Sequence, residues 1–365
     1  MILGNGMREK KMLKKKKRID EFDIAKGIAI IAMIIGHLGM KHINMIVYAF
    51  HMPLFFILSG YFLSAKDPFR HFIKKKFIGL IIPYYICAGL ICLTSVISNR
   101  FVNMLYTTFQ THDITTWITA MLYGAGSQHL LSHGLIPIGG IWFLQALFIA
   151  SIVVKLLDIL MGRHYEYVKA MIVLLLAVTS YISAKYIWLP LNIQTGLFST
   201  IYVYFGYFIK QHFDYQVIKE KYLMNGKVII AFIVLFILSV FYEQGQSYLV
   251  NLSIKGGIIS IIMSFFNSFL IIDISIAIQD YLNKGRRILI WYGKNSLYLL
   301  CVHIWQMDLF PNPRGIFRRA FSRWGIPHPY FLSKTTTLLF LILSATVIAY
   351  GITEAKRVQR LNFSK

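Results

Sequence analysis

Residues 23–61 read DIAKGIAIIAMIIGHLGMKHINMIVYAFHMPLFFILSGY, and this stretch decides the fold class. Two long apolar runs are separated only by a short polar turn at 41–43, a pattern that is typical of two antiparallel membrane helices. Apolar runs recur along the rest of the chain, and charged residues make up only 15% of the 365 residues, against about 25% in soluble domains. The chain is therefore predicted to be all-α, a polytopic membrane bundle of about ten transmembrane helices.

Ten apolar segments are predicted to span the membrane, since a span needs about 20 mostly apolar residues. The segments are Ile24–Gly39, Asn44–Leu63, Phe77–Ile97, Ile138–Leu157, Tyr167–Ala184, Leu197–Lys210, Val228–Tyr242, Gly257–Ile278, Ile288–Leu309 and Thr335–Tyr350. No Pro-, Gly- or Ser-rich linker divides them. We expect one transmembrane domain over 24–352, with a basic cytoplasmic segment at 1–23 and a basic cytoplasmic tail at 353–365.

The net charge is +23, and the basic residues are distributed along the chain as the positive-inside rule predicts. Basic residues concentrate in alternate gaps between the apolar runs, which places both termini in the cytoplasm, and this distribution disfavours a nucleic-acid partner. One loop breaks the rule. Residues 310–334 fall outside by count yet contain Arg314, Arg318, Arg319 and Arg323. Either a late span is miscounted, or these arginines contact lipid headgroups or an anionic polysaccharide.

Three ionisable residues, Asp23, Lys26 and His37, interrupt the first apolar run. Lys26 and His37 are eleven residues apart, which is almost three helical turns, so both side chains project from nearly one face about 16 Å apart along the axis. Asp23 lies one turn before Lys26 and can pair with it. Intramembrane ionisable residues mark functional sites by default. The alternatives are that Lys26 snorkels to the headgroups and that His37 faces water.

The same helix carries a stripe of small residues on a neighbouring face, which lets another helix approach closely. The stripe consists of Ala25, Ala29, Ala32 and Gly36. The first helix is therefore predicted to have one packing face beside one polar face.

The second span brings His51, two residues before Pro53. Proline leaves the carbonyl of Ala49 without its helical partner, and such breaks are tolerated where the backbone lines a cavity or meets other helices. Because the first two helices are antiparallel neighbours, His37 and His51 are predicted to meet in the outer half as a general base and its partner. The spacing of residues around His37 and His51 shows no third metal ligand. His303 is available as one, but no metal site is expected.

Weaker candidates lie further along the chain. Trp142 and Gln145 can contact a sugar, but a Trp near a span end is equally typical of an interfacial anchor. Asn295 and Ser296 either line a cavity or bond across helices, and His303 is an intramembrane histidine. Asp273 is expected to be paired and structural, or to accept a proton. The three cysteines, Cys87, Cys92 and Cys301, are expected to be packing residues.

These motifs, in this order, resemble the acyltransferase family 3 membrane enzymes. The resemblance is specific in the first 85 residues and looser beyond them. It rests on the following segments: Asp23–Gly27, the ten residues between Lys26 and His37, Phe50–Phe56, Leu58–Tyr61, Lys74–Lys76, Pro83–Tyr85, Trp142–Leu144 and Gly293–Leu297, with His303 after them. The later segments look most like the branch of fucose 4-O-acetylase-like and exopolysaccharide-modifying proteins.

The resemblance implies an O-acyltransferase of the bacterial cytoplasmic membrane that moves an acyl group, commonly acetyl, from acyl-CoA to a glycan hydroxyl. Acyl-CoA is then a co-substrate, no cofactor is permanently bound, and the partners are membrane lipid and a glycan or lipid-linked sugar. His37 would be base or acyl carrier with His51 assisting, Lys26 would hold the donor, and Asp23 would orient Lys26. Lys74, Lys75 and Lys76 would bind donor phosphates, and Trp142, Gln145, Asn295, Ser296 and His303 would contact substrate.

Two positions depart from the family pattern. The first basic residue of the family pattern is usually arginine, and this chain has Lys26 there. The family also has two arginines before the proline, and this chain has Lys76 and Gly79 at those positions, so the second basic residue is missing. Lysine and arginine differ in hydrogen-bond geometry, so donor binding is expected to differ in detail. Two further interpretations stay open: a transporter that exports or flips a glycan intermediate, and a scaffolding subunit whose buried polar residues are replaceable.

Overall fold

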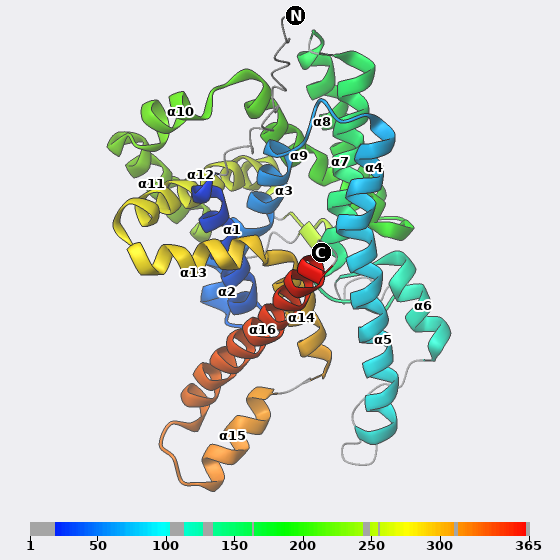
Figure 1. Ribbon diagram of the computed structural model, residues 1–365, viewed down its shortest axis with the longest axis vertical. Helices are drawn as coiled ribbons and strands as arrows, with labels where there is room; N and C mark the ends of the chain where they lie inside the picture. Colours follow the sequence, from blue (N-terminus) through cyan, green and yellow to red (C-terminus); the bar gives the residue numbers. More distant parts are fainter. Residues whose placement is uncertain are drawn as a thin grey trace, which may run out of the picture.

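The computed structural model describes residues 19–102, 113–126, 134–162, 164–243, 249–254, 256–309 and 313–362. These residues form a bundle of helices (Figure 1). The α-helices are α1 (Asp20–Gly36), α2 (Lys41–Tyr48), α3 (His51–Tyr61), α4 (Phe69–Lys76), α5 (Ile82–Val102), α6 (Ile114–Tyr123), α7 (Trp142–Met161), α8 (Glu166–Ser183), α9 (Ile193–His212), α10 (Tyr215–Ile218), α11 (Gly226–Glu243), α12 (Gly257–Tyr281), α13 (Asn283–Lys294), α14 (Ser296–Leu309), α15 (Pro313–Arg323) and α16 (Pro329–Asn362). The shorter helices are η1 (Phe77–Ile81), η3 (Pro190–Asn192), η4 (Lys219–Leu223) and η5 (Leu249–Asn251). The predicted all-α membrane bundle is confirmed.

Every predicted span coincides with helix, but fewer than ten are long and apolar enough to cross a membrane. Among the described residues, six helices pass that test by length and composition: Lys41–Tyr61, Phe69–Val96, Trp142–Met161, Glu166–Ser183, Gly257–Tyr281 and Pro329–Gln359. The pair Tyr215–Leu223 and Gly226–Tyr242, bent by 78°, makes a seventh if it is one span. At 17 residues α1 falls just short. The chain is a multi-pass membrane protein.

The predicted ninth span, 288–309, is not one helix. α13 ends at Lys294 and α14 begins at Ser296, so the chain changes direction at Asn295. α13 packs along α1 while α14 packs on α5 and α16. Because α14 has only 14 residues, it lies within the bundle as a short helix rather than completing a span with α13.

Two other helix breaks follow from proline. Pro53 and Pro83 lack the N–H that would bond to the carbonyl four residues back. Before Pro83 the backbone widens into the π-helical turn η1, which contains Gly79. Before Pro53 the chain breaks between α2 and α3, and the carbonyl of Ala49 accepts a hydrogen bond from the Asn267 side chain of α12 at 3.2 Å. The predicted break is therefore present, and another helix satisfies the carbonyl it frees.

Helix α1 sits at the centre, held by backbones that touch. A Cβ on Gly27 would collide with the carbonyl oxygen of Leu289 in α13, and one on Gly293 would collide with that of Asp23 in α1. The predicted small-residue stripe is also packed, since Ala25, Ala29 and Ala32 are buried in one hydrophobic cluster. A similar crossing joins α3 to α9, where Gly60 faces the backbone of Val203 and Gly206 that of Ile57. Small residues allow this approach in membrane helices.

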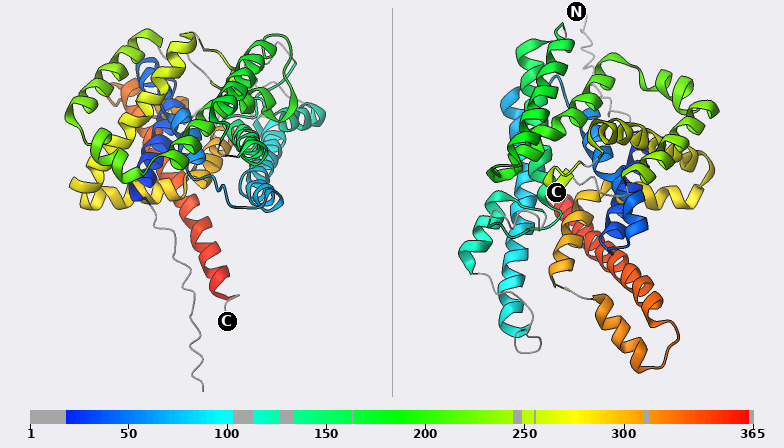
Figure 2. Two further views of the ribbon diagram at one scale, coloured as in Figure 1. Left: turned by 90° about the horizontal axis from the view of Figure 1, so that it is seen from above. Right: turned by 180° about the vertical axis from the view of Figure 1, so that it is seen from behind.

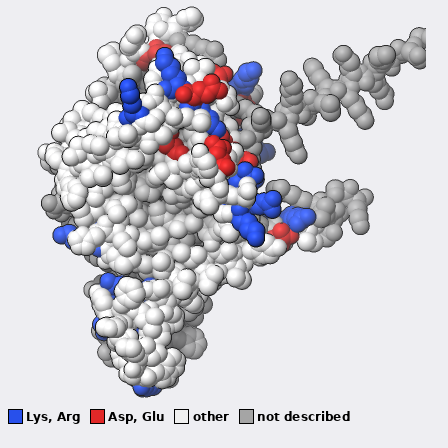
Figure 3. Space-filling view, turned by 90° about the vertical axis from the view of Figure 1, so that its left-hand side faces the viewer, with Lys and Arg blue, Asp and Glu red and all other residues white. Residues whose placement is uncertain are grey.

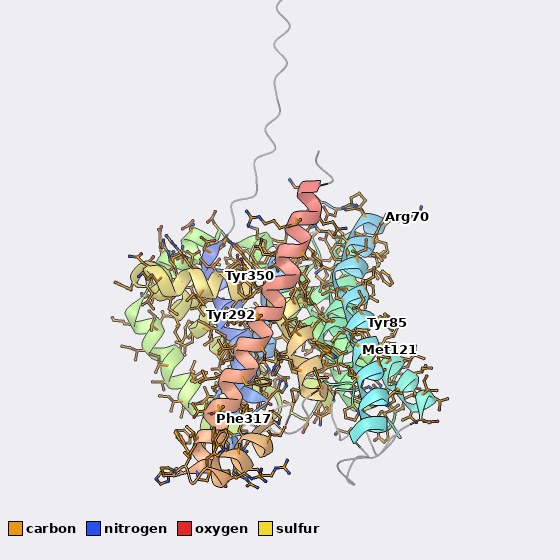
Figure 4. All side chains as sticks on the ribbon, turned by 60° about the horizontal axis from the view of Figure 1, so that its bottom comes forward. Arg70, Tyr85, Met121, Tyr292, Phe317 and Tyr350 are labelled. Atoms are coloured by element: carbon orange, nitrogen blue, oxygen red, sulfur yellow. The ribbon has the colours of Figure 1, made fainter. Side chains whose placement is uncertain are left out.

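The basic loops lie at two ends of the molecule. In Figure 4, Arg70 of α4 and the C-terminal end of α16 are at one end, and Phe317 of α15 is at the other. α15 packs against α16, and the pair projects from the bundle (Figure 2). Figure 3 shows charged residues gathered over part of one face, beside a wide area without them. The arginine-rich helix α15 therefore lies at the opposite end of the molecule from α4.

Candidate active site

A cavity of about 410 Å³ opens between the helices around α1. Helices α1, α2, α3, α7, α9, α12 and α14 all contribute to its wall. Its polar or basic lining residues are Lys26, His37, Tyr48, His51, Ser59, Trp142, Tyr202, Ser260, Ser264 and Ser296, and the rest of the wall is mostly apolar. A largely apolar cavity with a few convergent polar groups is the usual form of a binding site.

Lys26 and His37 both line this cavity. α1 runs without a break from Asp20 to Gly36, and His37 is its C-cap residue. The eleven-residue spacing on one continuous helix therefore places both side chains on one face, as the sequence predicted. Both residues therefore share one cavity, which is what a joint functional role requires.

At the Lys26 end, the ammonium is held by two neighbours. Its Nζ lies 2.7 Å from a carboxylate oxygen of Asp23, as predicted, and 5.6 Å from the centre of the Phe62 ring. The Asp23 side chain is 3% exposed and that of Lys26 is 21% exposed. The cation is thus oriented by a buried acid while part of it remains accessible to a ligand.

At the other end, His37 pairs with His303 of α14. Nδ1 of His37 lies 2.9 Å from Nε2 of His303, and the rings stack with centroids 5.1 Å apart and planes 15° apart. The sequence predicted His51 as the partner of His37, and this was wrong. The break after α13 turns α14 toward α1, and no periodicity of the sequence shows that turn.

His51 also lines the cavity, but its bond is to the backbone. Its Nδ1 lies 2.8 Å from the carbonyl oxygen of Val47 at the break between α2 and α3, and the same oxygen accepts a hydrogen bond from the backbone N–H of Phe50 at 3.4 Å. The side chain is buried. His37 and His51 therefore reach the same cavity from adjacent helices, as expected, without bonding to each other.

The predicted substrate contacts divide into two groups. Trp142 and Ser296 line the cavity. Gln145 points elsewhere and accepts a hydrogen bond from Asn192 at 2.9 Å, and Asn295 donates to the carbonyl of Trp291 at the end of α13. Gln145 thus links α7 to η3, and Asn295 closes the end of α13, both outside the cavity wall.

Lys74, Lys75 and Lys76 are outside the cavity lining. They occupy the last turn of α4, where Lys75 lies 3.8 Å from Asp67 and Lys76 lies over the Phe72 ring. This helix follows the loop that begins at Phe62, beside Lys26. α4 continues into η1, whose Leu80 lines the cavity, so the three lysines precede the wall in the chain without forming part of it.

Glycine residues shape the wall beside His37. A Cβ on Gly140 would lie 3.7 Å from Cε1 of His37 and 2.8 Å from a methyl group of Ile304. A Cβ on Gly126 would collide with Trp142. The sequence predicted neither, although the position of Gly140 two residues before Trp142 could have suggested it.

Asp273 does not join the site. It is 6% exposed in α12, and neither carboxylate oxygen has a hydrogen-bond partner in the described part of the chain. The expectation that it is paired was wrong. Within that part, no group of three or more His, Cys, Asp or Glu side chains is arranged to hold a metal ion.

Comparisons with known proteins identify the family of the chain. A family model described as an acyltransferase domain, that of acyltransferase family 3, matches residues 19–354, nearly the whole chain. No curated protein and no solved structure matches the chain significantly. A family match of this extent, in a chain with several membrane-spanning helices, shows that the chain belongs to acyltransferase family 3 and is a membrane acyltransferase.

Proposed function

We propose that this protein is an O-acyltransferase that moves an acetyl group from acetyl-CoA, or another short acyl group from its CoA ester, to a sugar hydroxyl of a cell-surface or exopolysaccharide glycan. One observation carries the proposal. Lys26 and His37 face a single cavity from one helix, which gives a cation at one end and imidazole chemistry at the other.

The Lys26 end suits the donor. CoA carries several phosphate charges, and an ammonium held by Asp23 can bind one of them as a point charge. Lys74, Lys75 and Lys76 end α4, one turn before the cavity-lining Leu80, and their positive charge can attract the donor before it enters. Acyl-CoA acts as a co-substrate in this scheme, and no permanently bound cofactor is invoked.

The His37 end suits the reaction. Acyl transfer to a hydroxyl requires proton transfer from the hydroxyl, for which imidazole is the commonest side chain. His303 fixes the orientation of His37, and His51 brings a second imidazole to the same wall. Trp142 and Ser296 offer a stacking surface and a hydroxyl to the sugar.

The proposed setting is the bacterial cytoplasmic membrane, with both termini in the cytoplasm. The basic segment 66–76 and the end of α16 share one end of the molecule, and basic segments face the cytoplasm. The donor would enter from that side, and the glycan or lipid-linked sugar would reach His37 from the outer half. The segment 1–23 would be a cytoplasmic extension and 353–365 a cytoplasmic tail of the domain at 24–352.

The test is transfer by the purified chain. Protein in detergent receives acetyl-CoA and a panel of sugar acceptors, and both free CoA and acetylated sugar are measured. We expect His37→Ala to abolish transfer while the protein still inserts and purifies. Absence of CoA release by wild type with every acceptor and acyl-CoA would refute the proposal. Mass spectrometry of surface glycans with and without the gene would then identify the acceptor by its added acetyl mass.

A transporter for a glycan intermediate is the alternative function. It predicts that proteoliposomes move labelled glycan and that acetyl-CoA is not consumed. Intramembrane ionisable residues and broken helices also mark transporters. Glycan flux and CoA release should therefore be measured on the same preparation.

A further inference from the structure

The two histidines of the cavity wall differ in how their protons are placed. A neutral imidazole has one nitrogen that donates and one that accepts. Nδ1 of His51 lies 2.8 Å from the carbonyl oxygen of Val47, and a carbonyl only accepts. Nδ1 must therefore carry the hydrogen, and Nε2 is left with its lone pair. Nε2 belongs to a ring in the cavity wall, so its lone pair is available to a ligand there.

His37 is held by another histidine, so its proton placement depends on that partner. His303 is fully buried, and its Nδ1 has no hydrogen-bond partner among the described residues. A buried N–H without a partner is rarer in proteins than a buried acceptor without one. In the favoured tautomer, Nδ1 of His303 carries no hydrogen and Nε2 of His303 does. The Nε2–H of His303 then donates to Nδ1 of His37. His37 then carries its own hydrogen on Nε2.

We propose that His51 is the proton acceptor of the reaction and that His37 is the donor that polarises the acyl group. The inference rests on the proposed function and divides its proton transfers between two residues. His51 presents a fixed lone pair to the cavity, and His37 presents an N–H, because Val47 sets one tautomer and the buried His303 favours the other.

The two histidines have separate roles in the transfer step. Nε2 of His51 takes the proton of the sugar hydroxyl as its oxygen bonds to the acyl carbon. Nε2–H of His37 hydrogen-bonds to the carbonyl oxygen while negative charge develops there. The carbon–sulfur bond then breaks, and its electron pair leaves with the sulfur of CoA. The proton on His51 passes to that thiolate, so the products are the sugar ester and free CoA.

Two substitutions separate this role from a structural one. In His51→Asn the amide nitrogen lies where Nδ1 was, so the bond to Val47 can persist while the lone pair of Nε2 is lost. In His51→Gln the amide reaches the Nε2 position, and the bond to Val47 is lost. A base at His51 predicts that both variants lose transfer by about 10² to 10⁴-fold, with His51→Asn melting at the wild-type temperature. A purely structural role predicts that His51→Asn keeps its activity.

The second readout is the acidity of the acceptor. A more acidic hydroxyl needs less help from a base, so the loss in His51→Asn should shrink along a series of acceptors of falling pKa. The matched control is His42→Asn, which makes the same change at an exposed position of α2 and should leave transfer unchanged. Transfer by His51→Asn within a few-fold of wild type, or a loss that is equal for every acceptor, would overturn the assignment. If wild type itself transfers no acyl group, the proposed function fails instead.

Discussion

Nδ1 of His37 lies 2.9 Å from Nε2 of His303, although 266 residues separate the two in sequence. The contact joins the end of α1, in the most family-specific part of the chain, to α14, near its end. α14 reaches α1 because the chain turns at Asn295, between α13 and α14. The position of the His37 ring in the cavity thus depends on the packing of the last third of the chain.

His303→Gln should reduce acyl transfer by about 10 to 100-fold, because small displacements of a catalytic group lower the rate strongly. Loss of the stacked ring frees the His37 imidazole to rotate. The expected effect is on kcat, with the KM for acyl-CoA unchanged, since His303 is distant from the Lys26 end. Steady-state kinetics of the purified variant measure both constants. His42→Gln is the control, and a change confined to KM would contradict the positioning role.

Lys26→Met should raise the KM for acyl-CoA by about 10-fold or more, because a charge-assisted hydrogen bond is worth roughly 1.5–3 kcal/mol. Methionine keeps most of the side-chain volume, but the buried Asp23 loses this cation, so a lower melting temperature is expected beside the change in KM. Lys26→Arg restores the residue usual in the family and should retain much of the affinity. Titration of acyl-CoA against CoA release measures this. Equal KM values for wild type and Lys26→Met would remove Lys26 from donor binding.

Gly293→Ala should disrupt the site without touching the cavity. The added methyl group would collide with the backbone of Asp23, one turn from Lys26. α1 and α13 must then separate, which moves the Asp23–Lys26 pair. We expect a lower melting temperature and a large loss of transfer.

Gly89→Ala is the matched control for this change. Gly89 also lies inside a helix, α5, but a Cβ there meets nothing within 4 Å. Alanine has the higher helix propensity, so Gly89→Ala should leave melting and transfer unchanged. Wild-type melting of Gly293→Ala would show that the α1–α13 crossing is looser than described.

The sequence predicted the features of the site that local rules control. The shared face of Lys26 and His37 follows from helical spacing on α1, and the break at Ala49 follows from the missing N–H of Pro53. The pairing of His37 with His303 depends instead on the turn between α13 and α14, which falls on Gly293–Ser296 inside the predicted span 288–309. Treating 288–309 as one straight span passes over this polar interruption, so the sequence did not place His303 beside His37. The backbone contacts of Gly27 and Gly293 likewise need both helices in place before a glycine is seen to be required.

Lys155→Met should destabilise the loop that connects α3 to α4. Lys155 is 1% exposed, and its Nζ donates to the carbonyl oxygens of Ala65 at 2.6 Å and Ser64 at 3.3 Å. Asp158 lies 3.8 Å away and also bonds to Tyr207. Methionine fills similar space but leaves these acceptors without their donor, at a cost of about 3 kcal/mol or more.

The loop held by Lys155 begins at Phe62, which contacts Lys26, and it leads to the lysines of α4. Loosening it should therefore also raise the KM for acyl-CoA, with a smaller effect on kcat. Thermal melting and limited proteolysis at 62–68 measure the first effect, and donor titration measures the second. Lys284→Met, at an exposed position of α13, is the control. Unchanged melting of Lys155→Met would show that the buried ammonium does not hold this loop, and its connection to the donor end would lose its basis.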